Sequence, residues 1–565
     1  MILDSLEEIL TSIIKNIYDV NHINLVLTNR SDLCDYQIND VFKIAKENKL
    51  NPIIVGENIE KAIREYPNYD KYFKNVEFVK PGFINISLSD NILNENLNYM
   101  VNNPKFGLKN SDPKVTFILD YGGPNIAKPL HVGHLRTAII GEAIKRIIKY
   151  KGNDVIADVH LGDYGLQIGE VIYAILNDHK KDEEITLDYL NEAYPRMSAI
   201  CKENEDIKKE CEEITKKMQD GDLEYNRLCD IITEVSLSDI KDLYKTLDVS
   251  FDLWESERSA YKYIPTVEEI LNNKGLLHES EGAMVIDVAC DTDSKEIPPM
   301  IFQKSNKAYL YGTTDMATIY DREQKYHPDY MIYVTDDRQS MHFKQVFRAS
   351  LKAGITDTTF EHKSYGTVNG PDGKPFKTRA GKAPSLRELL SETKDIFISK
   401  KEDNVNMSDD DINKIVNSIV KFADLQNNMA NDYIFDINKF ANTSGKTGPY
   451  ILYTYLRINK IIKDKDIDMN ILTNEIYNKY ERDLKLKLLE YQNVIDSAFM
   501  NRMPNYIADY LYDLCVLVNT FYQNNHINSL DDTIKQNNWI YLLSLTNKLL
   551  KELLNLLAIE IPTEM

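Results

Sequence analysis

The sequence predicts a multidomain α/β protein, in which a parallel-sheet core lies between an N-terminal α+β domain and a C-terminal all-α helical bundle. Its 565 residues are too many for one hydrophobic core, so several domains are expected. Strand and helix patterns alternate from about residue 113 to 395, which is typical of an open parallel sheet. Beyond residue 410 the apolar residues follow almost only helical spacing, which predicts a bundle.

We expect the first domain at residues 1–108. Apolar residues at helical spacing and short β-branched or aromatic runs divide it into mixed elements. The predicted elements are helices at residues 6–18, 39–48 and 59–65, and strands at residues 76–79 and 83–88.

The second domain is expected at residues 109–398 and the third at residues 399–565. Residues from about 180 to 250 are highly charged and have little strand character, so they predict a helical insertion packed on the sheet. Residues 400–411 are charged and polar, which is typical of a linker between domains.

The most informative motif is PNIAKPLHVGH at residues 124–134. A β-branched and aromatic run precedes it at residues 114–121, and a helical pattern follows it at residues 133–150. A helix that begins just after a strand points free N–H groups at a bound anion. His131 and His134, one turn apart, add donors there, so the motif predicts a phosphate site. The alternative interpretation is that two partly exposed histidines simply cap a helix.

Composition limits the function classes. The formal net charge of -21 argues against a non-specific nucleic-acid binder, whereas residues 431–565 carry only -3 and better suit an RNA backbone. The six cysteines form no Cys-x-x-Cys pair, so neither a metal site nor a disulfide framework is predicted. No apolar run reaches transmembrane length, and we therefore expect a soluble, cytoplasmic protein without a membrane partner.

The motif at residues 124–134 resembles the ATP-binding signature of class I aminoacyl-tRNA synthetases, and its flanks resemble the arginyl-tRNA synthetase family. Further segments resemble that family in the same order and over nearly the whole chain. These segments are residues 159–167, 311–315, 337–339, 447–450 and the C-terminal 560–565.

The resemblance implies an aminoacyl-tRNA synthetase of protein biosynthesis, with a Rossmann-type catalytic core. Such a ligase joins L-arginine to ATP as an aminoacyl-adenylate, and then passes the arginyl group to the 3′ end of tRNA(Arg). A triphosphate is presented with part of its charge neutralised, so Mg²⁺ is expected with ATP. The resemblance further implies a tRNA-recognition role for the N-terminal domain and an anticodon-binding role for the C-terminal one. We expect a monomer.

For the ATP site, the resemblance makes His131 and His134 donors to the phosphates, and Gly133 the position where a side chain would collide with the nucleotide. The family's second signature, Lys-Met-Ser-Lys, is incomplete at residues 373–381. Lys374 and Lys377 lie in that loop as ATP-binding candidates. The resemblance implies that Lys128 substitutes as the main catalytic cation, and the alternative is a solvated loop lysine.

For the amino acid, the resemblance implies that Asp315 binds the guanidinium beside Tyr311. Only a carboxylate accepts that planar fork of donors in pairs, so charge complementarity favours the same role. Glu257 is a second acceptor, and Asn125 and Gln339 hold the ammonium and carboxylate ends. Asp120 is a further candidate at the end of its strand. Taken alone, a Tyr-x-x-x-Asp pair is more often an ordinary helix surface.

For RNA, Tyr450, Tyr453 and Arg457 recur on one face of a predicted helix, and such a face suits unstacked bases. The resemblance places this helix at the anticodon; the alternative is that the tyrosines pack within the bundle. By the same resemblance, the other tRNA-binding candidates are Phe83, Asn85 and the C-terminal Met565.

Two alternatives to the ligase remain at the level of sequence. One is a small-molecule nucleotidyltransferase with the same phosphate site, although such an enzyme would not need the helical bundle with its Tyr/Arg face. The other is a non-catalytic synthetase paralogue that only binds tRNA. The intact His131, His134, Asn125, Asp315 and Gln339 argue against that second alternative.

Overall fold

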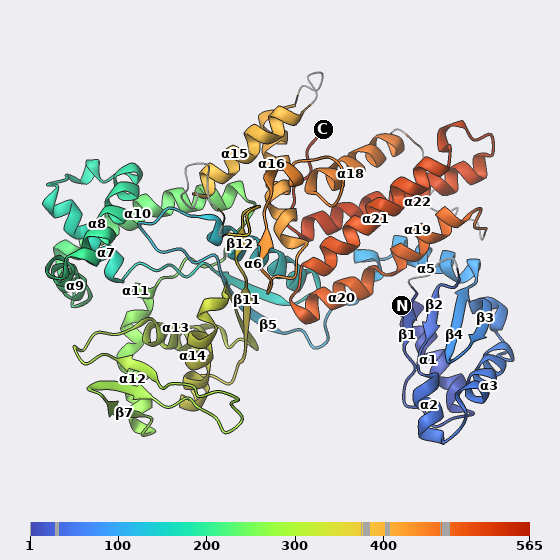
Figure 1. Cartoon of the computed structure of the whole chain (residues 1–565), viewed down its shortest axis with the longest axis horizontal. Coiled ribbons are helices and arrows are strands. Elements are labelled where there is room, and N and C mark those ends of the chain that lie inside the picture. Colours follow the sequence, from blue (N-terminus) through green and yellow to red (C-terminus); the bar gives the residue numbers. More distant parts are fainter. Residues whose placement is uncertain are drawn as a thin grey trace. The chain divides into compact units, whose positions relative to one another are not determined.

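A computed structural model describes residues 2–28, 33–374, 376, 385–401, 407–463, 465 and 475–565 (Figure 1). The chain divides into two compact units. The first unit contains Met1–Lys109, Tyr453–Asp496 and Asp509–Leu553. The second contains Asn110–Leu452, Ser497–Ala508 and Leu554–Met565.

The N-terminal part of the first unit is an antiparallel sheet of order β1-β2-β4-β3, packed with helices. Strand β4 has the predicted bounds, whereas β3 begins three residues earlier than predicted and pairs with β4 across the turn at residues 80–82. The elements are α1 (Ile2–Lys15), β1 (Leu25–Leu27), β2 (Tyr36–Ile38), α2 (Val41–Asn48), α3 (Pro52–Arg64), α4 (Tyr69–Tyr72), β3 (Phe73–Val79), β4 (Phe83–Leu88) and α5 (Asp90–Asn102).

Helices from the C-terminal part of the chain complete the first unit. Within it, α19 contacts α5, and Arg482 on α19 reaches Asp35 at 2.6 Å and Asp90 at 2.7 Å. The C-terminal elements, some of which run on into the second unit, are α18 (Gly448–Ile462), α19 (Lys479–Leu489), α20 (Tyr491–Asn501), α21 (Asn505–Asn524) and α22 (Thr533–Leu556). The helical pattern predicted for this part of the chain is therefore confirmed.

The second unit is built on the predicted parallel sheet, whose strand order is β11-β10-β5-β6. Helix α6 contacts β5, β6 and β10, and α14 contacts β11. Buried apolar side chains of β5 and β10, such as Ile118 and Met331, pack against α13 and its neighbours. The bounds are β5 (Thr116–Tyr121), α6 (Val132–Tyr150), β6 (Asp154–Asp158), α13 (Tyr311–Tyr326), β10 (Tyr330–Asp336), α14 (Ser340–Ala353) and β11 (Thr359–Tyr365).

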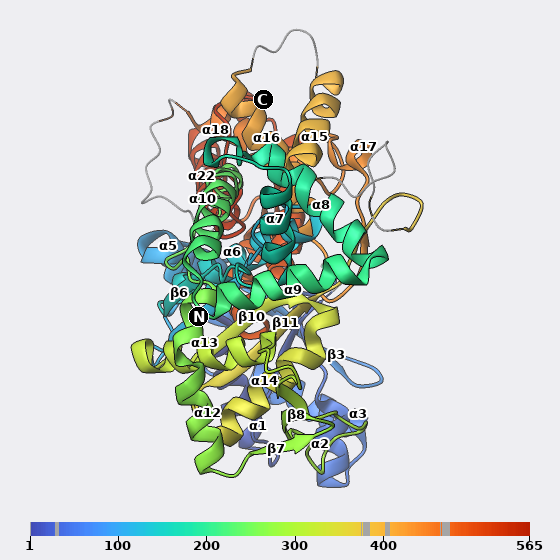
Figure 2. The same cartoon turned by 90° about the vertical axis from the view of Figure 1, so that its left-hand side faces the viewer.

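Between β6 and α13 the chain forms a group of helices that pack on one another (Figure 2). The apolar centre of this group includes Ala174, Ala193 and Met197. Its long helices are α7 (Leu166–Asn177), α8 (Leu187–Glu203), α9 (Glu205–Gln219) and α10 (Leu223–Thr246). Helical structure thus fills the stretch where the charged sequence predicted it.

A small antiparallel sheet, β7-β8-β9, was not expected from the alternating pattern. Its strands are only four residues each, too short for a period-two pattern to be distinctive. The remaining elements are α11 (Glu257–Ala260), α12 (Ile264–Asn273), β7 (Leu277–Ser280), β8 (Ala283–Ile286), β9 (Met300–Gln303), β12 (Val368–Asn369), α15 (Leu386–Lys400), α16 (Asp409–Leu425), β13 (Tyr433–Ile434) and α17 (Ile437–Phe440).

Among the described residues, no helix combines the length and the apolar character needed to cross a bilayer. The predicted linker at residues 400–411 overlaps both neighbouring helices, because residue 400 ends α15 and residues 409–411 already belong to α16. Its residues 402–406 lie outside the described residues.

Candidate active site

A cavity of about 670 Å³ opens at the carboxyl ends of β5 and β10. Ligands of open parallel sheets bind at this edge, because the loops that follow the strands converge there. Nine residues predicted from the sequence line this one cavity, although they come from segments up to about 220 positions apart. They are Asp120, Asn125, His131, Gly133, His134, Glu257, Tyr311, Asp315 and Gln339.

The first turn of α6 is closed by its two histidines. His131 is the N-cap residue, and its Nδ1 accepts a hydrogen bond from the Gly133 amide at 3.0 Å. The Nδ1 atom of His134 accepts a hydrogen bond from the His131 amide at 3.1 Å. A neutral imidazole that accepts at Nδ1 carries its proton on Nε2. Both rings therefore have an Nε2–H donor in addition to the cap.

Gly133 leaves room for this cap. A Cβ atom at Gly133 would lie 2.8 Å from the His131 ring, which is closer than side chains pack. The predicted reason for this glycine was a collision with a nucleotide, and the cap of His131 adds a second reason.

Both histidines of the cap favour the neutral form. Burial, with smaller effects of the charges of His131 and Lys128, lowers the pKa of His134 to about 3. Burial also lowers the pKa of His131, with added effects of Lys128 and Arg338. At neutral pH these rings are therefore hydrogen-bond donors rather than cations.

Unlike the nine residues above, Lys128 and Lys374, the described lysines among those predicted to bind ATP, are not among the residues that line the cavity. Lys128 is close enough to affect the pKa of both histidines, but its Nζ lies 4.7 Å from the centre of the Tyr194 ring on α8, and it does not line the cavity. Lys374 lies in an exposed turn. Lys377 lies outside the described residues.

A group of carboxyls lines the same cavity. Asp315 is on α13, and its Oδ2 is 2.5 Å from Nε2 of His342 on α14. Burial raises the pKa of Glu257 to about 8, and the charge of Asp315 raises it as well. The Tyr311 side chain, four residues before Asp315, is half-exposed, and burial of its hydroxyl, together with the nearby Glu257 charge, raises its pKa to about 12. This group of carboxyls can therefore accept a cation.

One glycine and a turn position the polar amides. Asn125 forms an isolated bridge with Gly162, and a Cβ atom on Gly162 would lie 2.3 Å from Oδ1 of Asn125. Gln339 ends the short turn before α14 and is exposed on the cavity wall. The bare backbone of Gly162 thus lets the Asn125 side chain occupy its position.

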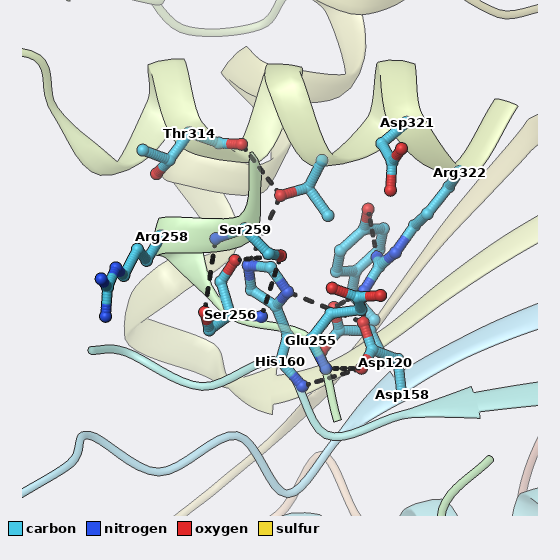
Figure 3. Close-up of polar contacts among 12 residues, drawn as sticks. Asp120, Asp158, His160, Glu255, Ser256, Arg258, Ser259, Thr314, Asp321 and Arg322 are labelled. Atoms are coloured by element: carbon cyan, nitrogen blue, oxygen red, sulfur yellow. Dashed lines mark hydrogen bonds and ion pairs between the residues drawn. The ribbon is translucent and has the colours of Figure 1, made fainter. Parts of the chain in front are cut away.

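Asp120 lines the cavity but is already bonded. Its Oδ2 accepts a hydrogen bond at 2.6 Å from Arg322, which also bonds Asp158 (Figure 3). Asp120, Asp158 and His160 have ligand atoms within 4.8 Å of one another, as in a metal site. However, the guanidinium of Arg322 already contacts both carboxylates and balances charge there. We therefore assign no metal to this group.

Sequence reasoning missed His342, Arg338 and Arg322. Arg338 lines the cavity and pairs with Asp336 at 2.7 Å. His342 follows Gln339 by three residues, so the predicted segment could have been extended to include it. Arg322 follows Asp315 by seven residues, which places both on one face of α13. That spacing was the available signal for Arg322.

The candidate tRNA residues lie outside this cavity. Tyr450, Tyr453 and Arg457 are all on α18. Tyr453 is 45% exposed, and the Arg457 guanidinium lies 4.7 Å from the centre of the Tyr522 ring. Asn85 is buried in β4 and accepts a hydrogen bond from Gln37 at 2.8 Å, Phe83 begins the same strand, and Met565 ends the chain.

Three family models match the chain in succession. The model of the class I (R) tRNA synthetase catalytic domain matches residues 96–437, and therefore contains the cavity. The arginyl tRNA synthetase N-terminal domain matches residues 4–88, and the DALR anticodon binding domain matches residues 451–565. These matches define the chain as a class I aminoacyl-tRNA synthetase.

Full-length relatives narrow the class. The chain is 39% identical to an arginine–tRNA ligase of Agathobacter rectalis, over 99% of this chain and 98% of the relative. It is 38% identical to that of Alkaliphilus oremlandii, over 97% of both chains. The crystal structure of arginyl-tRNA synthetase from Plasmodium falciparum is similar, with a TM-score of 0.83, 25% identity, and coverage of 100% of this chain and 99% of that one. The chain belongs to the arginyl-tRNA synthetase family.

We expect the pKa values of two histidines near the cavity, His134 and His160, to be shifted in opposite directions from the ordinary value. His134 should stay neutral down to a pKa of about 3, whereas His160 should stay protonated up to about 9. Burial alone would lower the pKa of His160, but the carboxylates of Asp158 and Asp120 outweigh it. NMR titration of histidine-labelled protein checks this, with His134→Gln and His160→Gln used to assign the signals.

The stability consequences also have opposite signs. Unfolded histidine titrates near 6.5, so the contribution of His134 is complete above about that pH and is lost as pH falls toward 3. The contribution of His160 is complete below about 6.5 and is lost as pH rises toward 9. A His134 signal that titrates near 6.5 in the folded protein would contradict the burial argument.

Proposed function

We propose that this protein activates L-arginine with ATP and transfers the arginyl group to the 3′ end of tRNA(Arg). The observation that carries the proposal is the polarity of the cavity. Neutral imidazole donors at the first turn of α6 and the carboxyls of Asp315 and Glu257 line the same cavity. Phosphates need donors and a guanidinium needs carboxylates, so the cavity suits both substrates at once.

In the first step the arginine carboxylate attacks the α-phosphorus of ATP, and pyrophosphate leaves. This chemistry depends on positioning and on stabilisation of developing charge. We assign the Nε2–H donors of His131 and His134 to the phosphates. Mg²⁺ enters with ATP as its phosphate complex and neutralises part of the charge.

We assign Lys128 as the main catalytic cation, with Lys374 and Lys377 as further ATP-binding residues. Support for Lys128 comes from its electrostatic effect on both histidines of the cap. Its flexible side chain, which now lies over a tyrosine ring, can turn toward the phosphates without a change in the backbone.

For the amino acid we assign Asp315 and Glu257 to the guanidinium, with Tyr311 beside them. Glu257 favours its protonated form at neutral pH, because it is buried near Asp315. A guanidinium placed between the two carboxyls favours ionisation of both. Asn125 and Gln339 hold the ammonium and carboxylate ends. Asp120 lines the same cavity, and we place it at the edge of this pocket.

For tRNA we assign Tyr450, Tyr453 and Arg457 to the anticodon, and Phe83 and Asn85 to the tRNA body. We add Met565 as a contact at the C-terminus. The exposed ring of Tyr453 supports the first assignment, because unstacked bases bind to such rings. The proposed domains are residues 1–108 for tRNA recognition, 109–398 for catalysis, and 399–565 for the anticodon.

We also propose that the protein acts as a monomer in the cytoplasm. None of the six cysteines, which all lie among the described residues, forms a disulfide, as is usual for proteins of a reducing compartment. The full-length similarity to arginine–tRNA ligases gives no support to a small-molecule nucleotidyltransferase or to a non-catalytic paralogue.

ATP–pyrophosphate exchange tests the function directly. We expect exchange with arginine among the twenty amino acids, and we expect it to require Mg²⁺. By family resemblance we also expect it to require tRNA(Arg). Exchange stimulated by another amino acid would contradict the substrate assignment, and full exchange with arginine and ATP alone would contradict only the tRNA requirement.

Replacement of Lys128 tests the catalytic cation. Lys128→Ala should lower kcat at least about tenfold, which corresponds to roughly 1.4 kcal/mol of transition-state stabilisation, with little change in the KM for arginine. Lys180→Ala is the matched control, because Lys180 also lies over a tyrosine of α8, Tyr189. If Lys374→Ala or Lys377→Ala lowers kcat more than Lys128→Ala, the assignment to Lys128 is wrong.

Replacement of Asp315 tests the guanidinium pocket. Asp315→Asn should raise the KM for arginine on the order of a hundredfold, because a charge left without its partner costs a few kcal/mol. Asp321→Asn on the same helix is the control, since Asp321 pairs with Lys325 outside the cavity. Steady-state aminoacylation measures both variants, and an unchanged KM in Asp315→Asn would show that the guanidinium is bound elsewhere.

A further inference from the structure

The protein has a buried guanidinium of its own beside the cavity, that of Arg322 on α13. Asp158, Asp120 and Tyr333 are cross-strand neighbours on β6, β5 and β10. The Nη2 atom of Arg322 donates to both aspartates at 2.6 Å, and Nη1 donates to the Tyr333 hydroxyl at 3.0 Å. One side chain thus connects α13 to three neighbouring strands of the sheet, near the carboxyl ends of β5 and β6 and at the middle of β10 (Figure 3).

This connection is shielded from water. The side chain of Arg322 is 3% exposed, that of Asp158 is 0% and that of Asp120 is 12%. Solvent therefore screens these charges little, and their geometry is held more firmly than that of a surface pair. A buried guanidinium with hydrogen bonds to three strands fixes both the position of α13 along the sheet and its rotation about the helix axis.

A second bond lies one turn earlier on the same helix. Thr318 Oγ1 is 3.4 Å from Nε2 of His160, whose other ring nitrogen lies 3.6 Å from Asp158. Tyr311, Asp315, Thr318 and Arg322 follow one another at spacings of four, three and four residues, so they share one face of α13. The first two face the cavity, and the last two hold the helix to the sheet.

We propose that Arg322 is a positioning residue for arginine recognition, which sets the place of Asp315 and Tyr311 by fixing α13 on β5, β6 and β10. The inference rests on the proposed function, because it assigns Arg322 to the amino-acid pocket of that reaction.

Arg322 has a further consequence for specificity. Asp120 lines the cavity, and it forms with Asp158 a pair of carboxylates that suits a guanidinium fork. With Arg322 bonded to that pair, Asp315 and Glu257 are the acceptors left to a substrate guanidinium at this cavity, among the residues assigned to it. Removal of the Arg322 side chain would leave Asp120 and Asp158 as a second guanidinium site, which competes with Asp315 and Glu257 for the substrate.

Arg322→Lys tests the geometry, since lysine keeps the charge but lacks the planar fork. We expect the KM for arginine to rise at least about tenfold, with the KM for ATP changed less than about twofold, because misplacement affects only the helix with the arginine contacts. Arg348→Lys on α14 is the matched control: its guanidinium pairs with Asp293 at 2.7 Å outside the cavity, and both KM values should stay unchanged.

Arg322→Ala tests whether a guanidinium must fill the site between Asp120 and Asp158. Free guanidinium ion, added below denaturing concentrations, should lower the KM for arginine of this variant, because it refills the site between Asp120 and Asp158. The same ion should raise the KM of the wild-type enzyme, where it competes at Asp315. A merely structural defect would not reverse the sign of this effect.

The outcomes separate the inference from the function. A wild-type enzyme that is inactive with arginine would overturn both. An active wild-type enzyme, with an unchanged arginine KM in Arg322→Lys or with equal rises for arginine and ATP, would overturn the inference alone. A folded Arg322→Ala enzyme that guanidinium only inhibits would overturn it as well.

Discussion

The carboxyl edge of the parallel sheet imposes the constraint on which the site depends. Its register places Asp120 beside Asp158 on adjacent strands, where both carboxylates are largely removed from water. Two like charges in such a place need a cation with matching geometry. Arg322 and the protonated His160 supply it. Because Arg322 comes from α13, charge balance at the sheet edge also determines where that helix lies.

The donors and the acceptors that line the cavity come from different elements. At the start of α6, two histidines of lowered pKa give Nε2–H donors without a fixed charge. Such neutral donors can stabilise negative charge that develops on a ligand during the reaction without binding the ground state too tightly. At α13 and α11 the acceptors are the carboxyls of Asp315 and Glu257.

The sequence predicted what is local and missed what is distant. The strand before residue 124 and the helix after it could be predicted, because the motif and both patterns are contiguous. The spacing of Arg322 from Asp315 indicated a shared helix face but not its partners, because Asp120 and Asp158 lie 202 and 164 residues away. The strands β7, β8 and β9 were missed for a different reason: at four residues each, they are too short to show a distinctive period of two. For Asp120 the position at a strand end was predicted, but not its guanidinium partner.

The two carboxyls that we assign to the guanidinium are not bare in the structure. Asp315 has His342 at 2.5 Å, where the carboxylate outweighs the effect of burial and raises the pKa of that histidine. Glu257 favours its protonated form at neutral pH. For the proposed function, a substrate guanidinium therefore replaces His342 at Asp315 and the proton on Glu257. It does not meet two unpaired carboxylates. Binding of this kind costs less desolvation than insertion into an unbalanced site, and it discriminates against neutral analogues, which offer no charge in exchange.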